Sequence, residues 1–336
     1  MMGALWAPVA EARIAMTYFY RPLQVILFAG LTTVCQGLFA QSALMQPGVN
    51  VPRTSAGLPD LHGIWDFRTI TPLQRPESLD YEVFASPEAA AAFRVAEVER
   101  VNRDNFTNPA ATGDYNDFWY DRGVELTPDL RTSLIMDPPN GRIPALTPAA
   151  QERLRVAAVE RELAVGVETR PLEERCLMGF NAGPPMLPSA YNNNMQLVQT
   201  GDHVVIVNEM VHDARIVKMD VDTHRDVPRR WEGDSIGRWE GDVLIVETRN
   251  FKGPTSFYAS SENMELTERF WMIDADTLGY QFTINDPTTF TAPWTAMFPM
   301  SRSSEPMYEY ACHEGNYSLP GILGGFRTLE RLEAEI

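Results

Sequence analysis

The clearest hydrophobic pattern in the chain runs through residues 202–251. Between 203 and 219, valines such as Val205 and Val217 alternate with Val204 and Ile206, so that apolar side chains point in both directions. A run that is apolar on both faces predicts a strand, or two strands with a bend, buried on both sides. Polar residues within such a run need partners, and Asp213 and Arg215, two positions apart, are predicted to share a face and to pair.

A duplicated unit follows this run. Trp-Glu-Gly-Asp stands at 231–234 and again at 239–242. Gly241 gives the second copy the backbone freedom of a tight turn, so a hairpin is predicted with strands over 236–240 and 243–248. The first copy is also expected to be a turn.

Other segments complete the predicted architecture. Helices are expected over 86–102 and 147–163, because Ser86-Pro87 and Thr147-Pro148 each combine an N-cap residue with a proline in the first turn. Further strands are expected at 59–67, 196–200, 267–273, 278–284, 290–298 and 305–311, before a Gly-rich tail at 319–325. Many short strands are typical of an antiparallel sandwich or barrel. We favour a mainly β fold: an antiparallel β-barrel with two accessory helices and long loops.

The N-terminus has the pattern of an export signal. Arg21 precedes an apolar run that ends at Ala40, which predicts a signal peptide over 1–40 and a start at Met1 or Met16. An uncleaved anchor is the alternative, although the run is short for a span. A linker is expected over 41–56, followed by a single β-rich domain over 57–336 that contains the two helices. This organisation predicts a periplasmic or secreted protein with no stable membrane insertion after cleavage.

Composition excludes some partners. The formal net charge is -17 and the pI is near 4.7. Nucleic-acid binding needs a basic surface, so no nucleic-acid partner is expected. The sequence has neither a Walker A motif nor a Gly-x-Gly-x-x-Gly fingerprint, and no HExxH spacing, so no cofactor and no metal site is predicted. The expected partner is a small-molecule ligand or substrate.

Two cysteines remain after removal of the signal. Cys176 and Cys312 form an even pair that favours a disulfide in an oxidising compartment. Such a bond closes a long loop and is worth up to about 5 kcal/mol on the chain-entropy account. Two free buried thiols are the alternative.

Several motifs carry a resemblance. Glu174-Arg-Cys176, Gly183-Pro-Pro-Met186, Tyr191-Asn-Asn193, the stretch 231–242 and Cys312-His-Glu-Gly-Asn-Tyr317 resemble a group of secreted bacterial proteins without an assigned activity. The resemblance spans most of the mature chain. In addition, Gly63-Ile-Trp65 is similar to the first-strand Gly-x-Trp of lipocalins and other calycins, which implies a lipocalin-like barrel.

Two groups of residues are candidates for catalysis. His313 and Glu314 lie next to Cys312, and a histidine held beside a carboxylate is the usual general base. The second group is His212, Asp213 and Arg215. In it the histidine would be the acid or base, the aspartate would orient the histidine, and the arginine would bind a developing oxyanion. Each group also has a structural alternative. His313 and Glu314 could satisfy the hydrogen bonds of buried backbone, and the second group could form a paired ion network in the core. Candidate binding residues are His224, Trp231, Trp239, Asn316, Tyr317 and Tyr191.

These residues support more than one function. The first hypothesis is an exported, cofactor-free hydrolase, lyase or isomerase that acts on a neutral amphipathic small molecule. The second is a lipocalin-like binding protein that holds such a molecule unchanged, with its histidines outside the cavity. The third is an exported structural module. The first requires His212, His224 and His313 to face one common pocket.

Overall fold

The barrel is built from strands that follow one another along the second half of the chain. A computed structural model describes residues 45–105, 116–224, 228–253 and 257–335, which belong to one compact unit, Leu44–Ile336. The predicted signal segment, 1–40, lies outside the described residues. In sheet order the strands are β1 (Gly63–Asp66), β3 (Asn194–Gln199), β4 (His203–Asn208), β5 (Ala214–Met219), β6 (Asp234–Glu240), β7 (Val243–Arg249), β8 (Glu265–Met272), β9 (Thr277–Asn285), β10 (Trp294–Ser303) and β2 (Ile135–Asp137).

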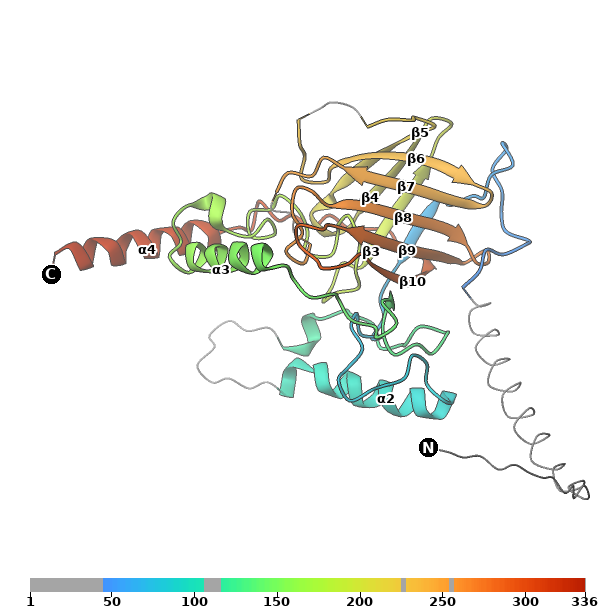
Figure 1. Ribbon diagram of the computed structural model, residues 1–336, viewed down its shortest axis with the longest axis horizontal. Coiled ribbons are helices and arrows are strands. Elements are labelled where there is room, and N and C mark those ends of the chain that lie inside the picture. Colours follow the sequence, from blue (N-terminus) through green and yellow to red (C-terminus); the bar gives the residue numbers. More distant parts are fainter. Residues whose placement is uncertain (1–44, 106–115, 225–227, 254–256, 336) are drawn as a thin grey trace, which may run out of the picture. The chain divides into compact units, whose positions relative to one another are not determined.

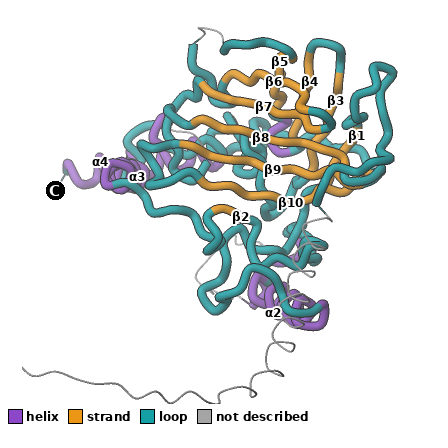
Figure 2. Tube along the Cα trace, turned by 45° about the vertical axis from the view of Figure 1, so that its right-hand side comes forward, coloured by secondary structure: helices purple, strands orange, loops and turns teal. Residues whose placement is uncertain are grey.

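Pairing of β1 with β10 closes the sheet into a barrel of nine strands (Figures 1 and 2). The last residues of β10 pair with β1, while its first residues pair with β2 outside the barrel. The closure is reinforced by Arg302, whose guanidinium lies 4.3 Å from the ring centroid of Trp65 and donates to the His62 carbonyl at 2.7 Å. The predicted barrel is therefore confirmed.

One pairing corrects the antiparallel prediction. β5 and β6 run parallel, with Val217 opposite Ser235 and Met219 opposite Gly237. The segment between them returns to the end of the barrel at which β5 began, so β6 starts in the same direction. The barrel is therefore mixed, and antiparallel pairing holds for the other neighbours.

The stretch that looked apolar on both faces forms two strands, β4 and β5, joined by the 3-10 turn η4 (Met210–His212). Val204 and Ile206 point into the barrel and are buried, whereas Val205 is only partly buried and Ile216 is 57 % exposed. The prediction that both faces of this stretch are buried was therefore wrong. A barrel strand turns one face to the interior and the other to solvent or to covering loops.

Side chains fill the barrel interior. Large residues from several strands are fully buried there and pack as one cluster, among them Trp65, Phe270, Tyr280, Phe282 and Phe298. The rings contact one another: Tyr280 lies 4.9 Å from Phe270 and 5.2 Å from Phe298 between centroids. Such a core stabilises the barrel by burying apolar area, with aromatic pairs adding about 1 kcal/mol each.

The hairpin predicted over 236–248 is present, and the strands expected at 267–273 and 278–284 form a second hairpin. β6 and β7 join at Gly241, whose φ of +62° is in the left-handed region that the turn requires. β8 and β9 join through the turn at 273–276. In the first Trp-Glu-Gly-Asp copy, the Gly233 N–H donates to the Arg230 carbonyl and φ is +74°, so this copy is also a turn.

The two predicted helices occur as α2 (Pro87–Val101) and α3 (Pro148–Glu162). Their caps act as expected, because the Ser86 and Thr147 hydroxyls accept from Ala89 N and Ala150 N at 3.2 and 3.1 Å. The C-terminal prediction was wrong. Residues 305–311 are not a strand, and the Gly-rich tail is instead part of a third helix, α4 (Ser318–Ala334). Its Arg327 donates at 3.0 Å to the carbonyl of Ala164, which follows α3 in the chain.

Candidate functional site

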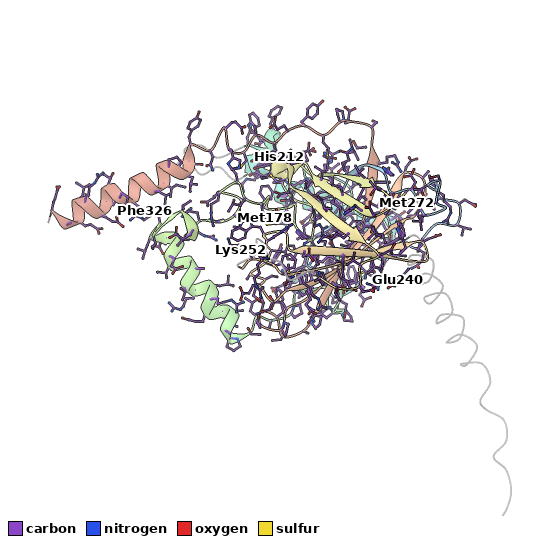
Figure 3. The ribbon with its side chains drawn as sticks, turned by 90° about the horizontal axis from the view of Figure 1, so that it is seen from above. Met178, His212, Glu240, Lys252, Met272 and Phe326 are labelled. Atoms are coloured by element: carbon purple, nitrogen blue, oxygen red, sulfur yellow. A yellow bond between two sulfur atoms is a disulfide. The ribbon has the colours of Figure 1, made fainter. Side chains whose placement is uncertain are left out.

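Several of the predicted site residues lie toward one end of the barrel, although they do not form one cluster. At this end β4 finishes, β5 and β6 begin, and the Cys176–Cys312 disulfide lies nearby; we call it the disulfide end. Figure 3 shows His212 near this end and Glu240, in the β6–β7 hairpin, at the other. The disulfide has a Cα–Cα distance of 5.7 Å across a separation of 136 residues, so the predicted bond is confirmed.

The β4–β5 connection has an unusual backbone. Val211 (φ 60°) and His212 (φ 45°) are both left-handed, a conformation that costs a branched residue such as valine of the order of 1–3 kcal/mol. Surrounding contacts impose it. Val211 and Met210 are buried against Ala182, and the Asn208 N–H donates to the Asp213 carbonyl at 2.8 Å. The turn therefore fixes the direction in which His212 and Asp213 leave the barrel.

Asp213 is the most perturbed carboxyl at the disulfide end. Burial, and to a smaller extent the nearby Glu232 carboxylate, raise its pKa from the usual range to about 7. Opposing these effects, the Gly179 N–H donates to Asp213 Oδ2 at 3.2 Å and His212 lies close enough to favour the charged form. The Asp213 side chain is partly buried, its neighbour Glu232 is also partly buried, and His212 is exposed. Asp213 thus exchanges its proton near neutral pH.

Arg215 does not pair with Asp213, contrary to the prediction. Asp213 ends the η4 turn, so the strand alternation begins only at Ala214 and Arg215 points into the barrel. There its guanidinium forms a two-point ion pair with the Glu268 carboxylate, one contact being 2.9 Å. Tyr280 donates to the same carboxylate at 2.8 Å. This is the paired core network that the sequence left open, and it removes Arg215 from solvent.

Tyr280 completes that network. Burial, and then the charge of Glu268, raise the pKa of its phenol well above the ordinary value, so the hydroxyl keeps its proton and donates. The hydroxyl also accepts from the Met186 N–H at 3.1 Å. The interior charges are therefore satisfied by one another and by backbone, which is the condition for tolerating them in a core.

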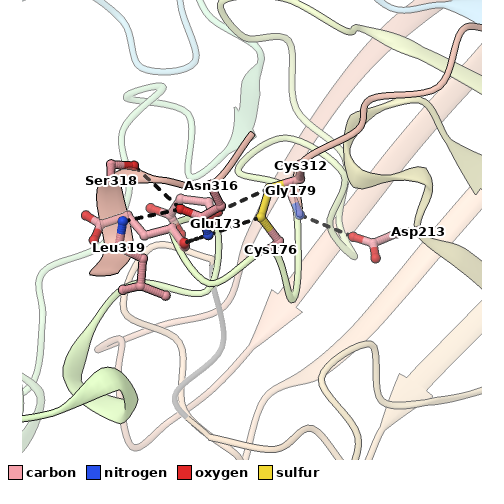
Figure 4. The surroundings of a disulfide bond; sticks show 9 residues. Glu173, Cys176, Gly179, Asp213, Cys312, Asn316, Ser318 and Leu319 are labelled. Carbon is pink, nitrogen blue, oxygen red and sulfur yellow. Dashed lines mark hydrogen bonds between the residues drawn. A yellow bond between two sulfur atoms is a disulfide. The ribbon is translucent and has the colours of Figure 1, made fainter. Parts of the chain in front are cut away.

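The segment 312–317 is anchored through the Cys312 disulfide and through the Asn316 side chain. The Asn316 amide donates to the Glu174 carbonyl at 2.7 Å and approaches Cys176 Sγ at 3.5 Å (Figure 4). His313, Glu314 and Tyr317 are exposed, Tyr317 by 82 %. Within the described chain no hydrogen bond joins the His313 ring to Glu314, so the carboxylate does not set the tautomer of this imidazole as predicted.

The remaining histidine and tryptophans lie apart from one another. His224 Nδ1 is 3.3 Å from Asp234 Oδ2, and Lys218 Nζ pairs with the same carboxylate at 2.7 Å. Trp231 lies at the disulfide end, with Lys252 Nζ 4.7 Å and the Arg175 guanidinium 5.8 Å from its ring centroid. Trp239 stands in the β6–β7 hairpin at the opposite end and packs on the barrel core.

An aromatic pocket of about 440 Å³ lies beside the disulfide end. It is lined by Trp119, Tyr120, Tyr191, Asn192 and Tyr310, and we call these five residues the aromatic pocket. Tyr191 and Tyr310 pack against the same cluster as Val211. Of the five, the sequence singled out only Tyr191 for binding. The aromatic density at 118–120 was a usable signal, whereas Tyr310 was hidden in a predicted strand.

A second hollow, of about 450 Å³, lies on the other side of Tyr120, with Arg68, Arg122 and Asp121 in its lining. Neither hollow is lined by His212, His224 or His313. The common histidine pocket that the first hypothesis requires is therefore not formed by the described residues at these two places.

Comparison with protein-family models and with curated proteins gives no match to the chain. In the described part of the chain, no set of three or more His, Cys, Asp or Glu side chains is arranged to hold a metal ion. None of the described helices has the length and apolar character needed to cross a bilayer.

Proposed function

We propose that this protein is an exported enzyme in which Asp213, with His212 beside it, transfers a proton to or from a small molecule bound at the disulfide end. The reaction classes are hydrolysis, elimination or isomerisation. The observation that carries the proposal is the placing of Asp213, a partly buried carboxyl that ends a strained turn and accepts from the Gly179 N–H at 3.2 Å. Burial and Glu232 raise its pKa to about 7. A group with a pKa near the working pH is the most effective general acid or base.

The surroundings of Asp213 support this role. The strained turn at Val211 and His212 and the bond from Gly179 hold the carboxylate in one direction, as proton transfer requires. Asp213 is only partly buried, and Oδ2 is the oxygen that accepts from the Gly179 N–H. Arg215, enclosed with Glu268, takes no direct part and serves to stabilise the barrel.

Export is the second component of the proposal. The apolar segment over 1–40 has the pattern of a signal peptide, and a disulfide such as Cys176–Cys312 persists in oxidising compartments. Both observations support the proposal of a periplasmic or secreted location. Detection of the processed form, beginning near Gln41, in a periplasmic or culture fraction supports it; an unprocessed cytoplasmic chain with free thiols contradicts it.

The catalytic assignment is tested by comparing the mature protein with Asp213→Asn on a library of esters, hydroxycarbonyl compounds and epimerisable small molecules. We expect the wild type to convert at least one compound, and the variant to lose a factor of about 100 or more, the usual contribution of a positioned acid or base. Asp276→Asn, an exposed carboxylate in the β8–β9 turn, is the matched control. Equal rates for wild type and Asp213→Asn on a converted compound exclude the assignment.

A binding protein without catalysis is the second candidate. One observation favours it: the aromatic pocket has no histidine in its lining, as a simple binding site predicts. The two candidate functions differ in whether a compound incubated with the protein is recovered changed or unchanged. A ligand that is bound by wild type and by Asp213→Asn alike, and released unchanged from both, identifies a binding protein.

A further inference from the structure

The aromatic pocket has the size and the lining of a built ligand site. Its volume, about 440 Å³, falls within the range of small-molecule pockets. Four of its five lining residues are aromatic and the fifth is Asn192, so in the described lining there is no Asp, Glu, Lys, Arg or His. Such a lining offers ring faces, tyrosine hydroxyls and one side-chain amide, and no formal charge.

One wall of the pocket is braced by hydrogen bonds, ring packing and the disulfide. Asn181, which is buried, donates to the carbonyls of Tyr191 and Asn192 at 3.0 and 3.1 Å. The Tyr191 and Tyr310 rings lie nearly parallel, 25° apart, with centroids separated by 6.4 Å. Cys312, two residues after Tyr310, ties this wall to Cys176. A wall fixed in this way loses little freedom on binding, which favours affinity.

Charge disfavours ionic ligands. The Arg122 guanidinium lies 4.4 Å from the Tyr120 ring centroid, and that of Arg103 lies 5.6 Å from it. A ligand cation on the other face of Tyr120 faces positive charge across the ring, which weakens cation–π binding. A ligand anion finds no cation in the described lining and approaches a chain of net charge -17.

We propose that the aromatic pocket binds an uncharged molecule through a flat ring, stacked on its tyrosine and tryptophan side chains, with Asn192 hydrogen-bonding a polar substituent. This inference rests on the proposed function, for which it names the substrate class and the place where the substrate's ring is held. The aromatic pocket is then the binding part of the site, and Asp213 is its reactive part.

A matched pair of fluorescent probes tests the pocket. N-phenyl-1-naphthylamine is uncharged, and 1-anilinonaphthalene-8-sulfonate has the same rings with one added sulfonate. We expect saturable binding of the uncharged probe to the full mature protein, and at least tenfold weaker binding of the sulfonate. The inference is overturned if the uncharged probe does not saturate, or if the sulfonate binds as tightly.

Substitutions locate the binding. Trp119→Ala and Tyr310→Ala should each raise the Kd of the uncharged probe at least tenfold, because each removes a stacking surface. Tyr308→Ala, at a tyrosine 70 % exposed and absent from the lining, should change it less than twofold. Trp119 is 59 % exposed, so its removal leaves the fold intact even if Tyr310→Ala unfolds. An unchanged Kd for folded Trp119→Ala places the probe elsewhere and overturns the inference.

One further variant separates this inference from the proposed function. Asp213→Asn should leave the Kd of the uncharged probe unchanged, because Asp213 is outside the pocket lining. On a converted substrate, Trp119→Ala should raise KM at least tenfold, whereas Asp213→Asn should lower kcat. If Asp213→Asn leaves kcat unchanged, the catalytic proposal fails. If Trp119→Ala leaves KM unchanged, the pocket inference fails.

Discussion

At the scale of single residues, two carboxyl groups show how partners decide the chemistry of a buried acid. Glu268 is enclosed, but Arg215 and Tyr280 supply two charge-assisted donors and one neutral donor. Asp213 is less enclosed, yet among the described residues only the Gly179 N–H donates a hydrogen bond to it, and Glu232 is a repelling neighbour. The first is therefore part of the core, and the second is available for proton transfer.

Asp213→Asn should stabilise the protein above neutral pH. The folded-state pKa, about 7, exceeds that of the unfolded chain, so wild-type stability falls as pH rises from about 4 to about 7 and stays low above that range. At pH 8 the variant should gain at most about 4 kcal/mol in free energy of unfolding, because each unit of pKa shift is worth about 1.4 kcal/mol. The gain should vanish near pH 4. Urea unfolding of both proteins at the two pH values measures it. A pH-independent difference shows that the pKa is not raised.

Removing one partner of the interior ion pair should be strongly destabilising. Glu268→Ala leaves the Arg215 guanidinium buried without its counter-charge, at a cost of about 3–5 kcal/mol. Replacing both residues, as Arg215→Met with Glu268→Leu, should recover most of the loss, because apolar side chains suit the surrounding core. Denaturant midpoints of the single and double variants test this. Additive losses rule out the coupling.

At the scale of elements, the repeated Trp-Glu-Gly-Asp units allow an internal comparison. Gly233 and Gly241 both have positive φ, but a Cβ on Gly233 meets the Arg249 carbonyl oxygen at 2.6 Å, whereas a Cβ on Gly241 meets nothing within 4 Å. Gly241→Ala should therefore cost only the backbone term, about 1 kcal/mol. Gly233→Ala should cost about 3 kcal/mol or more, because overpacking is added. Equal losses in thermal or urea unfolding contradict the structure.

Element predictions succeeded where the signal is local. Ser86 and Thr147 each mark the start of a helix, because one side chain caps its first turn. Gly241 marks a turn through its positive φ. α4 gave no such signal: its first residue follows Tyr317, which makes no side-chain cap, and three glycines precede Phe326. The parallel β5–β6 pair was also beyond local reasoning, since alternation predicts a strand and not the direction of its neighbour.

At the scale of the whole molecule, the site is assembled from segments that are distant in sequence. His212 and Asp213 were candidates because ionisable residue types cluster within one short stretch, and Cys176 was predicted because it forms an even pair with Cys312. Glu268, 53 positions from Arg215, could not be assigned as its partner, because the pairing exists only once the barrel closes. The aromatic pocket likewise joins residues 119, 191 and 310, whose common feature before folding was only their type.

The disulfide makes the last of these connections, and its removal should act mainly on the end of the chain. Cys312 follows the final barrel strand, β10, and 304–317 forms no strand or helix of its own. The bond and Asn316 are the chief anchors of that segment to 173–176. On the chain-entropy account the cross-link is worth at most about 5 kcal/mol, and local release lets the barrel keep most of its stability.

Cys176→Ser with Cys312→Ser should therefore increase hydrogen exchange in 304–317 and 173–180 far more than in β7–β9. The uncharged probe should bind at least tenfold more weakly as well, because Tyr310 loses the tether that holds it in the aromatic pocket. Amide exchange followed by mass spectrometry, with wild type under non-reducing conditions as the reference, measures the first effect. Uniform loss of protection across the barrel shows instead that the cross-link stabilises the fold as one cooperative unit.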